Sequence, residues 1–334
     1  MAFVGRQVSV IGAGSWGTTV ASLAASHGEV VLWARNPDVV REINEDHRNH
    51  QYLGPHVLPS AVRGEADLAS AVGLADVVAM AIPAKGFSEI AQIAGKVAKP
   101  GSIVVSLTKG LAVGSRQRMS EVLQESFPQC GVAVLSGPNL ASEIITGQPA
   151  ASVVASTDES VAREVVAALS TPLFRLYTNE DVVGCEIGGV VKNVIAIGAG
   201  IAQGFGFGDN AKAAVITRGL AEMTRLGVAL GARAETFSGL AGLGDLVATC
   251  ASMQSRNTQV GVRLGRGETI ESIESSMQMV AEGVRASSLV VELANEHRVE
   301  MPISEQVALV CQGRKSAADA LTDLLSRRSK AEFE

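Results

Sequence analysis

Short apolar runs alternate with helical patterns over the first half of the chain. Six runs have the length and the β-branched content of buried strands, and they lie at residues 8–11, 30–33, 77–81, 103–106, 132–135 and 151–154. Helical patterns follow the first run and recur near residues 86–97, 115–125 and 159–169. Because strands alternate with helices, the sequence predicts an α/β fold with a mainly parallel sheet and helices on both of its faces.

The pattern changes after Tyr177. From about Val182 onward the apolar positions follow helical spacing, and no strand-like run is visible. The sequence therefore predicts that the second half of the chain is an all-α domain. The polar tail from Arg327 is expected to fray.

The most apolar stretch of this second half contains a single ionisable side chain. Between Ile187 and Phe207 the chain is almost wholly apolar or glycine, apart from Lys192. About 20 apolar residues can span a bilayer. Glycines interrupt this run, however, and a central lysine would cost roughly 2.5–3.5 kcal/mol in a membrane. We therefore expect a buried helix and no stable membrane insertion.

Lys192 is the first candidate for chemistry. On a helix, the residues three, four or seven positions away are mostly glycine or alanine, so a flat or bulky group could lie against the amine. Burial disfavours the charged amine and can lower its pKa from ~10.4 toward the ~7–8 that suits a general base. The alternative is a lysine whose stem is buried and whose amine reaches water.

Composition limits the class of protein. The 334 residues suffice for two domains, and 47% hydrophobic with 19% charged residues describes a soluble globular chain. A net charge of -6 argues against general affinity for nucleic acid. The four cysteines and five histidines are dispersed, so we expect no metal site. Arg6 and Gln7 interrupt any export signal, and a cytoplasmic location is expected.

The first strand-like run leads into a glycine-rich turn. Gly12-Ala13-Gly14-Ser15-Trp16-Gly17 has GxGxxG spacing and lies between a strand and a helix, with a second strand beyond, which is the context that binds dinucleotides. The first glycine permits the tight turn, the second lets the backbone approach a pyrophosphate, and the third lets helix and strand pack. We expect NAD or NADP here, with a flavin dinucleotide or no ligand as alternatives. The predicted domains are then a Rossmann-type dinucleotide-binding domain at residues 1–184 and a helical substrate-binding domain at residues 185–334.

The end of the second strand bears on the choice of cofactor. The acidic residue expected about 20 positions on for NAD would fall near Arg35, within the neutral-to-basic segment Trp33-Ala34-Arg35-Asn36. Arg35 could pair with the 2′-phosphate of NADP, or it could stack on adenine, and Asp38 lies nearby. We therefore predict NADP(H) as the preferred cofactor, with NAD(H) as a second one that the chain could use.

Other polar residues follow strand-like or glycine-rich segments. Lys109 could face a phosphate or a substrate oxygen, or it could be a solvated loop lysine. Asp245 follows a glycine-rich turn and suits a helix cap as well as a catalytic carboxylate. Ser255-Arg256-Asn257 precedes a helical stretch that ends at Gly265. Free amides, a guanidinium and a carboxamide could converge there on a phosphate, or a capped and solvated helix could simply begin.

Seven motifs in register give the chain a family resemblance. They are Gly12–Gly17 with Trp16, Thr108-Lys109-Gly110, Ser136-Gly137-Pro138, Val191-Lys192-Asn193, Gly244-Asp245-Leu246, Ser255-Arg256-Asn257 and Ala281-Glu282-Gly283. The order and spacing of these motifs resemble those of the NAD(P)-dependent sn-glycerol-3-phosphate dehydrogenases of the bacterial type. The resemblance extends from about Val8 to Leu325. The chain departs from that family at Asn139, where many relatives carry serine or threonine.

The resemblance implies an activity and the residues that perform it. The implied reaction is reversible hydride transfer between C4 of the nicotinamide and C2 of dihydroxyacetone phosphate or sn-glycerol 3-phosphate, which supplies glycerol 3-phosphate for glycerophospholipid synthesis. Lys192 would be the catalytic proton acceptor in oxidation and the proton donor in reduction. The implied substrate contacts are Lys109, Gly137, Asn139, Lys192, Asp245, Ser255, Arg256 and Asn257. The implied cofactor contacts are Gly12, Gly14, Ser15, Trp16, Gly17, Arg35, Lys109, Ala141, Arg256, Val280 and Glu282.

Two other functions stay open at this point. Another β-hydroxyacid-type dehydrogenase, for example one acting on 6-phosphogluconate, would use the same plan of domains, although Ser255-Arg256-Asn257 with Gly244-Asp245 favours glycerol phosphate. A dinucleotide sensor would bind the cofactor without turnover and leaves Lys192 unexplained. The expected partner is a small phosphorylated triose. The apolar helical domain has surface to bury, so a homodimer is compatible with the sequence.

Overall fold

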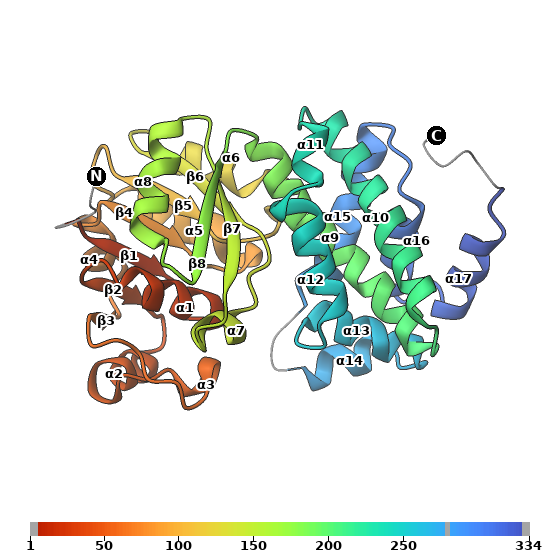
Figure 1. Cartoon of the computed structure of the whole chain (residues 1–334), viewed down its shortest axis with the longest axis horizontal. Helices are drawn as coiled ribbons and strands as arrows, with labels where there is room; N and C mark the ends of the chain where they lie inside the picture. The colour runs from red at the N-terminus through yellow and green to blue at the C-terminus, as the bar shows by residue number, and fades with distance from the viewer. Residues whose placement is uncertain (1–5, 278–280, 329–334) are drawn as a thin grey trace. The chain divides into compact units, whose positions relative to one another are not determined.

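The structure is a computed structural model that describes residues 6–277 and 281–328. The chain divides into two compact units. The first runs to Glu186 and includes Gly239–Ala241, and the second comprises Ile187–Ser238 and the chain from Gly242 onward. Strands occur in the part coloured red to yellow-green in Figure 1, and the part coloured green to blue is helical.

The first unit contains one eight-stranded sheet. In the order β3-β2-β1-β4-β5-β6-β7-β8, neighbouring strands are parallel except for β6 and β7, which are antiparallel. The strands are β1 (Val8–Ile11), β2 (Val30–Trp33), β3 (Val62–Glu65), β4 (Val77–Met80), β5 (Ile103–Ser106), β6 (Gly131–Ser136), β7 (Ala150–Ala155) and β8 (Phe174–Asn179). The predicted α/β fold with a mainly parallel sheet is confirmed.

Helices cover both faces of this sheet. They are α1 (Ser15–Ala24), α2 (Pro37–Asp46), α3 (His50–Leu53), α4 (Leu68–Gly73), α5 (Ala84–Gly95), α6 (Met119–Ser126), α7 (Ala141–Ile145) and α8 (Glu159–Leu169). Val8 and Val10 of β1 share one hydrophobic core with α1 and α8, whereas Ile11 shares a second core with α4, α5 and α6. Because the central strands are buried on both sides, each appears in the sequence as a short continuous apolar run.

The sequence pattern missed the two strands at the edges of the sheet. β3 and β8 each pair on one side only, and they expose side chains such as Arg63 and Arg175. Neither strand therefore forms an apolar run.

The helix predicted from residue 115 begins instead at Met119. The Arg118 N–H donates to the Glu121 carboxylate at 2.8 Å, and this hydrogen bond caps the start of the helix there.

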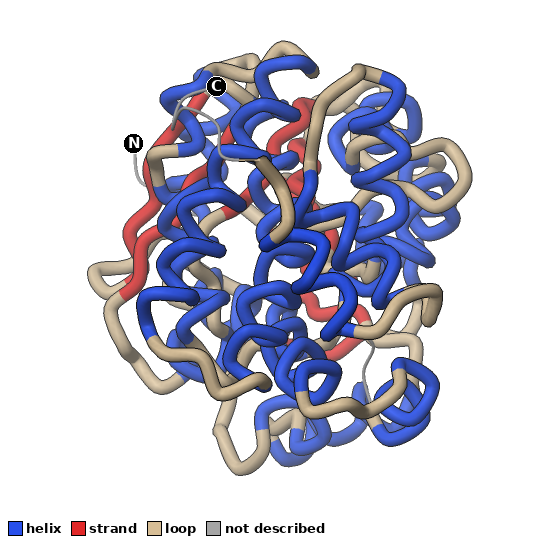
Figure 2. The backbone as a smooth tube through the Cα atoms, turned by 90° about the vertical axis from the view of Figure 1, so that its right-hand side faces the viewer, coloured by secondary structure: helices blue, strands red, loops and turns tan. Residues whose placement is uncertain are grey.

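From Val182 to the C-terminus the described residues form helices and no strand, which confirms the predicted all-α second part. Figure 2 draws the helices of the whole chain in blue and the strands in red. The helices are α9 (Val182–Gly204), α10 (Asp209–Ala229), α11 (Ala234–Phe237), α12 (Asp245–Ala251), α13 (Arg256–Gly265), α14 (Ile270–Ser276), α15 (Glu282–Glu296), α16 (Pro302–Cys311) and α17 (Ala317–Leu325). A single π-helical turn, Leu240–Gly244, leads into α12.

Helix α9 contains the apolar stretch around Lys192. Among the described helices it is the one long and apolar enough to cross a membrane by length and composition. Of its most apolar window, 83% is buried inside the protein, as in the core helix of a globular fold. This burial agrees with the buried helix that the sequence predicts.

Glycines bring α9 and α13 into direct backbone contact in the second unit. A Cβ added to Gly200 would lie 2.4 Å from the Thr258 carbonyl oxygen, and one added to Gly261 would lie 2.1 Å from that of Ile197. One turn further along, Gly204 and Gly265 make the same kind of contact. The helix that carries Lys192 is thereby fixed against the helix that begins with Arg256.

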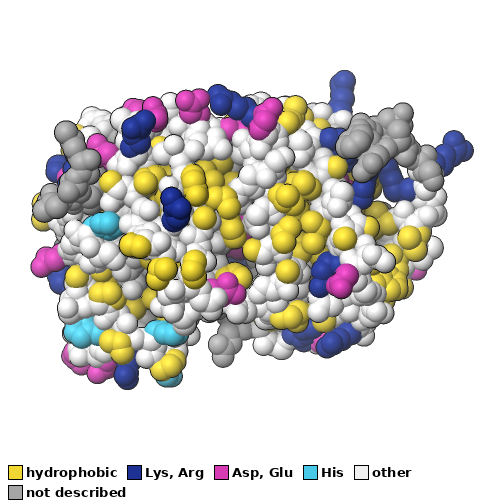
Figure 3. Space-filling model, in the orientation of Figure 1, with side chains coloured by type: hydrophobic (Ala, Val, Ile, Leu, Met, Phe, Trp, Pro, Cys, Tyr) yellow, Lys and Arg dark blue, Asp and Glu magenta, His cyan; other side chains and the backbone are white. Residues whose placement is uncertain are grey.

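The charged surface is mixed. On the face drawn in Figure 3, Lys and Arg side chains stand at separate positions and are interspersed with acidic and uncharged groups. That face therefore presents no continuous basic surface for a polyanion.

Candidate active site

The glycine-rich turn has the geometry of a dinucleotide-binding turn. Gly12 has a φ of +115°, and a Cβ there would lie 2.6 Å from the Ala81 carbonyl oxygen. A Cβ on Gly17 would lie 1.9 Å from the Gly12 carbonyl oxygen, so α1 packs tightly against the turn. Gly14 stands in open space and is the N-cap of α1, with no side chain capping the helix. The amides at the start of α1 can therefore receive an anion.

The two residues after Gly14 extend this surface. The Ser15 hydroxyl donates to the Tyr52 carbonyl oxygen at 3.0 Å and can still accept a hydrogen bond. Trp16 packs edge-to-face on Phe174, and its Nε1 is a buried donor with no partner among the described residues. An unpaired buried donor at this position fits a site that a polar ligand completes.

Arg35 lies just beyond the end of β2 and is exposed. The nearby Asp38 carboxylate is paired with Arg41 at 2.8 Å, and Asn36 caps α2 through the Asp38 N–H. The carboxylate that the sequence placed near Arg35 therefore has a cationic partner of its own.

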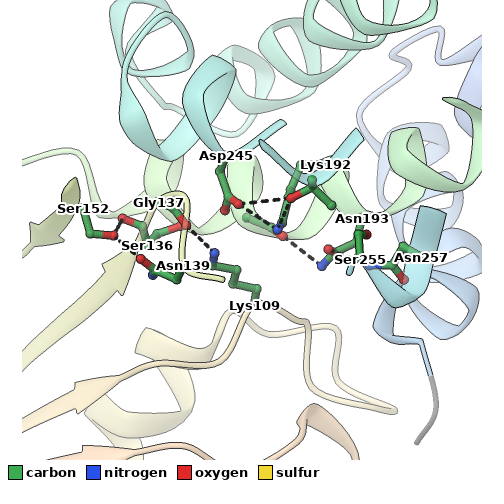
Figure 4. Close-up of polar contacts among 12 residues, drawn as sticks. Lys109, Ser136, Gly137, Asn139, Ser152, Lys192, Asn193, Asp245, Ser255 and Asn257 are labelled. Carbon is green, nitrogen blue, oxygen red and sulfur yellow. Dashed lines mark hydrogen bonds and ion pairs between the residues drawn. The ribbon is translucent and has the colours of Figure 1, made fainter. Parts of the chain in front are cut away.

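Lys109, Gly137 and Asn139 come together in the first unit, beyond the ends of β5 and β6 (Figure 4). The Lys109 ammonium donates to the Gly137 carbonyl oxygen at 2.6 Å. Gly137 has a φ of +141°, and a Cβ there would lie 2.4 Å from Ser152 Oγ, so only glycine fits. Ala141 begins α7 two residues after Asn139.

Ser152 sets the position of the Asn139 side chain. Its hydroxyl lies 2.8 Å from Asn139 Oδ1 and 2.9 Å from the Ser136 carbonyl oxygen. Asn139 Nδ2 is a buried donor without a partner among the described residues. This nitrogen can donate to an oxygen of a bound ligand.

Lys192 and Asp245 form a buried ion pair in the second unit. The ammonium lies 2.8 Å from the Asp245 carboxylate and 2.7 Å from the Thr249 hydroxyl (Figure 4). The Lys192 and Asp245 side chains are only 9% and 2% exposed. A buried charge is tolerated when it is paired and hydrogen-bonded, so each residue stabilises the charge of the other.

The structure excludes one of the two uses that the sequence allows for Asp245, that of a helix cap. Gly244, not Asp245, is the N-cap of α12, and Asp245 is the first residue of that helix. Its carboxylate is therefore placed beside Lys192 instead of acting as the cap. Thr249 lies four residues further along α12, on the same face as Asp245.

The thiol next to this pair is inert. Cys250 follows Thr249 and is fully buried. Burial raises its pKa to about 12, against the smaller opposing influence of the Lys192 charge. The thiol is therefore protonated at neutral pH.

The residues at the start of α13 have different surroundings. The Ser255 hydroxyl caps the start of α13 by accepting a hydrogen bond from the Thr258 N–H at 3.2 Å. Arg256 is exposed. Asn257 is buried, donates to Asn193 Oδ1 at 2.9 Å and accepts from the Gly283 N–H at 2.9 Å. Asn257 thus joins α9, α13 and α15.

Glu282 and Val280 are the remaining predicted cofactor residues. Glu282 is the first residue of α15. Val280 lies outside the described residues. Among the residues that are described, no group of three or more His, Cys, Asp or Glu side chains could hold a metal ion.

Three polar residues contact predicted site residues, although the sequence assigned no role to them. Thr249 contacts Lys192, Asn193 contacts Asn257, and Ser152 contacts Asn139. Thr249 could have been found from its i+4 spacing to Asp245. Nothing in the sequence connects Ser152 with Asn139, because Ser152 lies in β7 and Asn139 in the loop after β6, and the antiparallel pairing of these strands brings them together.

Comparison with known families agrees with the two-part organisation. A model of the N-terminus of NAD-dependent glycerol-3-phosphate dehydrogenase matches residues 7–162, and a model of the C-terminus matches residues 181–322. The chain belongs to the NAD-dependent glycerol-3-phosphate dehydrogenase family. The resemblance seen in the sequence motifs is thereby confirmed.

Similar proteins cover nearly the whole chain. A glycerol-3-phosphate dehydrogenase (NAD(P)+) of Corynebacterium jeikeium is 51% identical over 330 residues, which are 98% of this chain and 99% of that relative. One from Sphingopyxis alaskensis is 48% identical over 319 residues, 96% of each chain. The crystal structure of glycerol-3-phosphate dehydrogenase from Coxiella burnetii has a TM-score of 0.92 and 35% identity, and the match covers 97% of this chain and 100% of that one.

Proposed function

We propose that this chain is an oxidoreductase that interconverts sn-glycerol 3-phosphate and dihydroxyacetone phosphate with NAD(P)(H). The observation that carries the proposal is the buried Lys192–Asp245 pair, which stands in a chain whose glycine-rich turn suits a dinucleotide. Such a pair supplies a proton donor, and the turn supplies the redox cofactor with a place to bind. A dinucleotide sensor would need the turn but not the pair.

The glycine-rich turn and its neighbours are proposed to bind the cofactor. Gly14 leaves room for the pyrophosphate beside the amides of α1, and the unpaired Trp16 Nε1 is a further donor. When bound, the nicotinamide supplies or accepts the hydride. The proposed set of cofactor contacts is completed by Gly12, Ser15, Gly17, Arg35, Lys109, Ala141, Arg256, Val280 and Glu282.

Lys192 is proposed to exchange the proton. An ammonium has three N–H donors, and Asp245 and Thr249 take two of them among the described residues. The third is available to the oxygen at C2 of the substrate. In reduction Lys192 stabilises the charge that develops on this oxygen and then protonates it; in oxidation it accepts the proton. Asp245 holds the ammonium in place throughout.

Further residues are proposed to bind the phosphorylated substrate. Arg256, with its five N–H donors, suits the phosphate, and Asn139 offers a buried N–H that lacks a partner. Lys109, Gly137, Asp245, Ser255 and Asn257 complete the proposed set of substrate contacts. Binding of the phosphate, remote from C2, contributes energy that orients the reacting carbon.

NADP(H) is proposed as the preferred cofactor, with NAD(H) also used. The support is Arg35, which is exposed after β2, together with the Asp38 carboxylate that is occupied by Arg41. A guanidinium pairs with a 2′-phosphate, whereas the 2′-hydroxyl of NAD is usually bound by a carboxylate.

The proposal extends to the organisation of the protein in the cell. Residues 1–184 would form the dinucleotide-binding domain and residues 185–334 the helical substrate-binding domain, with each domain also contributing contacts to the other ligand. The enzyme would act in the cytoplasm, supply glycerol 3-phosphate for glycerophospholipid synthesis and form a homodimer.

Sedimentation velocity of the purified protein tests the proposed homodimer. A single species with the mass of the monomer would contradict it.

The oxidation direction separates this function from its rivals. Purified protein is given NADP+ with either sn-glycerol 3-phosphate or 6-phosphogluconate, and formation of reduced nicotinamide is followed. We expect reduction of the cofactor with sn-glycerol 3-phosphate alone. Reduction with 6-phosphogluconate alone would favour the other dehydrogenase, and binding of NADP+ without turnover of either compound would favour the sensor.

A further inference from the structure

Asn49 directs its side chain to the glycine-rich turn instead of to its own helix. It is the N-cap residue of α3, where an asparagine usually accepts a hydrogen bond from the helix. Its side chain makes no such cap bond. Instead Nδ2 donates to the Ala13 carbonyl oxygen and to Thr18 Oγ1, both at 2.8 Å. Asn49 is fully buried, so these two bonds form away from water.

The oxygen of the Asn49 carboxamide indicates that this side chain does more than fill space. Asn49 Oδ1 is buried and has no partner among the described residues. A side chain needed only to fill this space would be more stable without an unpaired acceptor. The orientation of the carboxamide is set by Ala13, because a carbonyl oxygen can only accept and the nitrogen must face it.

Holding the Ala13 carbonyl also orients the Gly14 amide. The Ala13 C=O and the Gly14 N–H belong to the same peptide group, and in a trans peptide they point in opposite directions. The Gly14 N–H therefore points away from Asn49. Gly14 stands in open space, where a Cβ would meet no atom within 4 Å. A second tether lies close by, since Ser15 Oγ donates to the Tyr52 carbonyl oxygen.

We propose that Asn49 is a positioning residue for the dinucleotide: by holding the Ala13 carbonyl it aims the Gly14 N–H at the pyrophosphate. The inference rests on the dinucleotide-binding role of the turn within the proposed function. Asn49 itself touches no part of the cofactor. Its effect passes through one peptide group, so it changes the affinity for the dinucleotide and not the chemistry at C2.

The test compares two variants that remove hydrogen bonds from the same side chain. Asn49→Asp has the same shape but cannot donate to Ala13, whereas Thr18→Val removes only the second acceptor and keeps the bond to Ala13. Binding of NADPH is measured without substrate, by quenching of tryptophan fluorescence. We expect the dissociation constant to rise about tenfold or more in Asn49→Asp and to stay within about twofold of the wild type in Thr18→Val.

Steady-state kinetics give an independent readout. Asn49→Asp should raise the KM for NADPH while kcat at saturating NADPH and the KM for dihydroxyacetone phosphate stay near wild type. Thermal unfolding of both variants shows how far each loses stability. A purely structural role would lower both melting temperatures and leave the affinity for NADPH unchanged.

Each outcome decides the matter. NADPH binding within about twofold of wild type in Asn49→Asp overturns the inference, as does equal weakening in both variants. If Asn49→Asp does not fold, Asn49→Ala gives the same comparison without a buried charge, and failure of both to fold while Thr18→Val folds also overturns it. Since binding is measured without turnover, wild-type protein that binds NADPH but reduces no triose phosphate would refute the proposed function and leave the Asn49 inference standing.

Discussion

At the scale of single residues, the Lys192–Asp245 pair is the feature on which the proposed chemistry depends. Both charges are buried, and they lie 2.8 Å apart. Removing one partner from such a pair leaves an uncompensated charge and costs about 3–5 kcal/mol of stability. Any substitution of Lys192 therefore needs a control that separates lost catalysis from lost folding.

Lys192→Ala is expected to lower kcat by about a thousandfold or more, because it removes the proton donor, while NADPH binding stays nearly intact. Turnover and NADPH affinity are measured on the same preparation. The double variant Lys192→Met/Asp245→Asn removes both charges and should fold with near wild-type stability, yet remain inactive. Near-normal turnover in any of these proteins would refute the role of Lys192.

Arg256→Ala is expected to raise the KM for dihydroxyacetone phosphate by about tenfold or more, because a charge-assisted contact with the phosphate is lost. Arg266→Ala serves as the matched control, since Arg266 is also exposed and follows the other end of α13. Steady-state kinetics at saturating NADPH supply both values. An unchanged KM in Arg256→Ala, or an equal rise in Arg266→Ala, would argue against a phosphate contact.

The sequence identified Lys192 and Asp245 as separate candidates but gave no sign that they are partners. They stand 53 residues apart, and only tertiary packing brings them together. From the sequence, the Lys192 amine could be buried or could reach water. In the structure the amine is buried, because it binds the buried Asp245 carboxylate and the Thr249 hydroxyl.

At the scale of elements, the contact between α9 and α13 holds the Lys192 helix in place. Gly200 and Gly204 face Gly261 and Gly265 with backbone in contact with backbone. The spacing of four residues between these glycines is visible in the sequence, but a glycine spacing does not say which helix will pack against it. The structure supplies the partner.

Gly261→Ala is expected to destabilise the protein by roughly 2–3 kcal/mol, because the added Cβ would lie 2.1 Å from the Ile197 carbonyl oxygen and would force the helices apart. Gly86→Ala, in α5, is the control, since its Cβ would meet nothing closer than 3.8 Å. Urea unfolding of both variants gives the free energies. Equal stability of the two variants would contradict the tight packing of α9 on α13.

Glu222 of α10 links stability to pH. Its carboxylate accepts from the N–H groups of Ile303 and Ser304 and so caps α16. Burial raises its pKa from 4.5 to about 7, against these hydrogen bonds and the Arg225 charge, which lower it. The folded protein therefore binds this proton more tightly than the unfolded chain does. This bound proton stabilises the folded protein. The stabilisation is complete below about pH 4.5 and is lost as the pH rises through about 7.

Glu222→Gln should remove this dependence. In the wild type, Glu222 contributes a decline of roughly 3 kcal/mol in the free energy of unfolding as the pH rises from about 4.5 to 8. In Glu222→Gln the decline over this range should be smaller by about that amount, whereas Glu159→Gln, at an exposed position of α8, should keep it. Urea unfolding at several pH values supplies the slopes, and an identical slope in Glu222→Gln would contradict the assignment.

At the scale of the whole molecule, the sequence predicted the fold class because each central strand is buried on both faces and appears as a short apolar run between helical patterns. It could not predict β3 and β8, whose side chains are partly exposed at the sheet edges, nor the antiparallel pairing of β6 and β7. Site residues could be named from motifs, and Thr249 lies at helical spacing from Asp245, but Ser152 could not be found, because only the fold brings it to Asn139.

Hydride exchange between NAD(P)(H) and a triose phosphate is the reaction on which every residue role proposed above depends. The most direct measurement mixes purified, folded protein with NADPH and dihydroxyacetone phosphate and follows the absorbance of the reduced nicotinamide, with NADH in a parallel sample. We predict rapid loss of absorbance, faster with NADPH than with NADH because of Arg35. Equal catalytic efficiency with both would contradict the cofactor preference, and no loss with either would contradict the function itself.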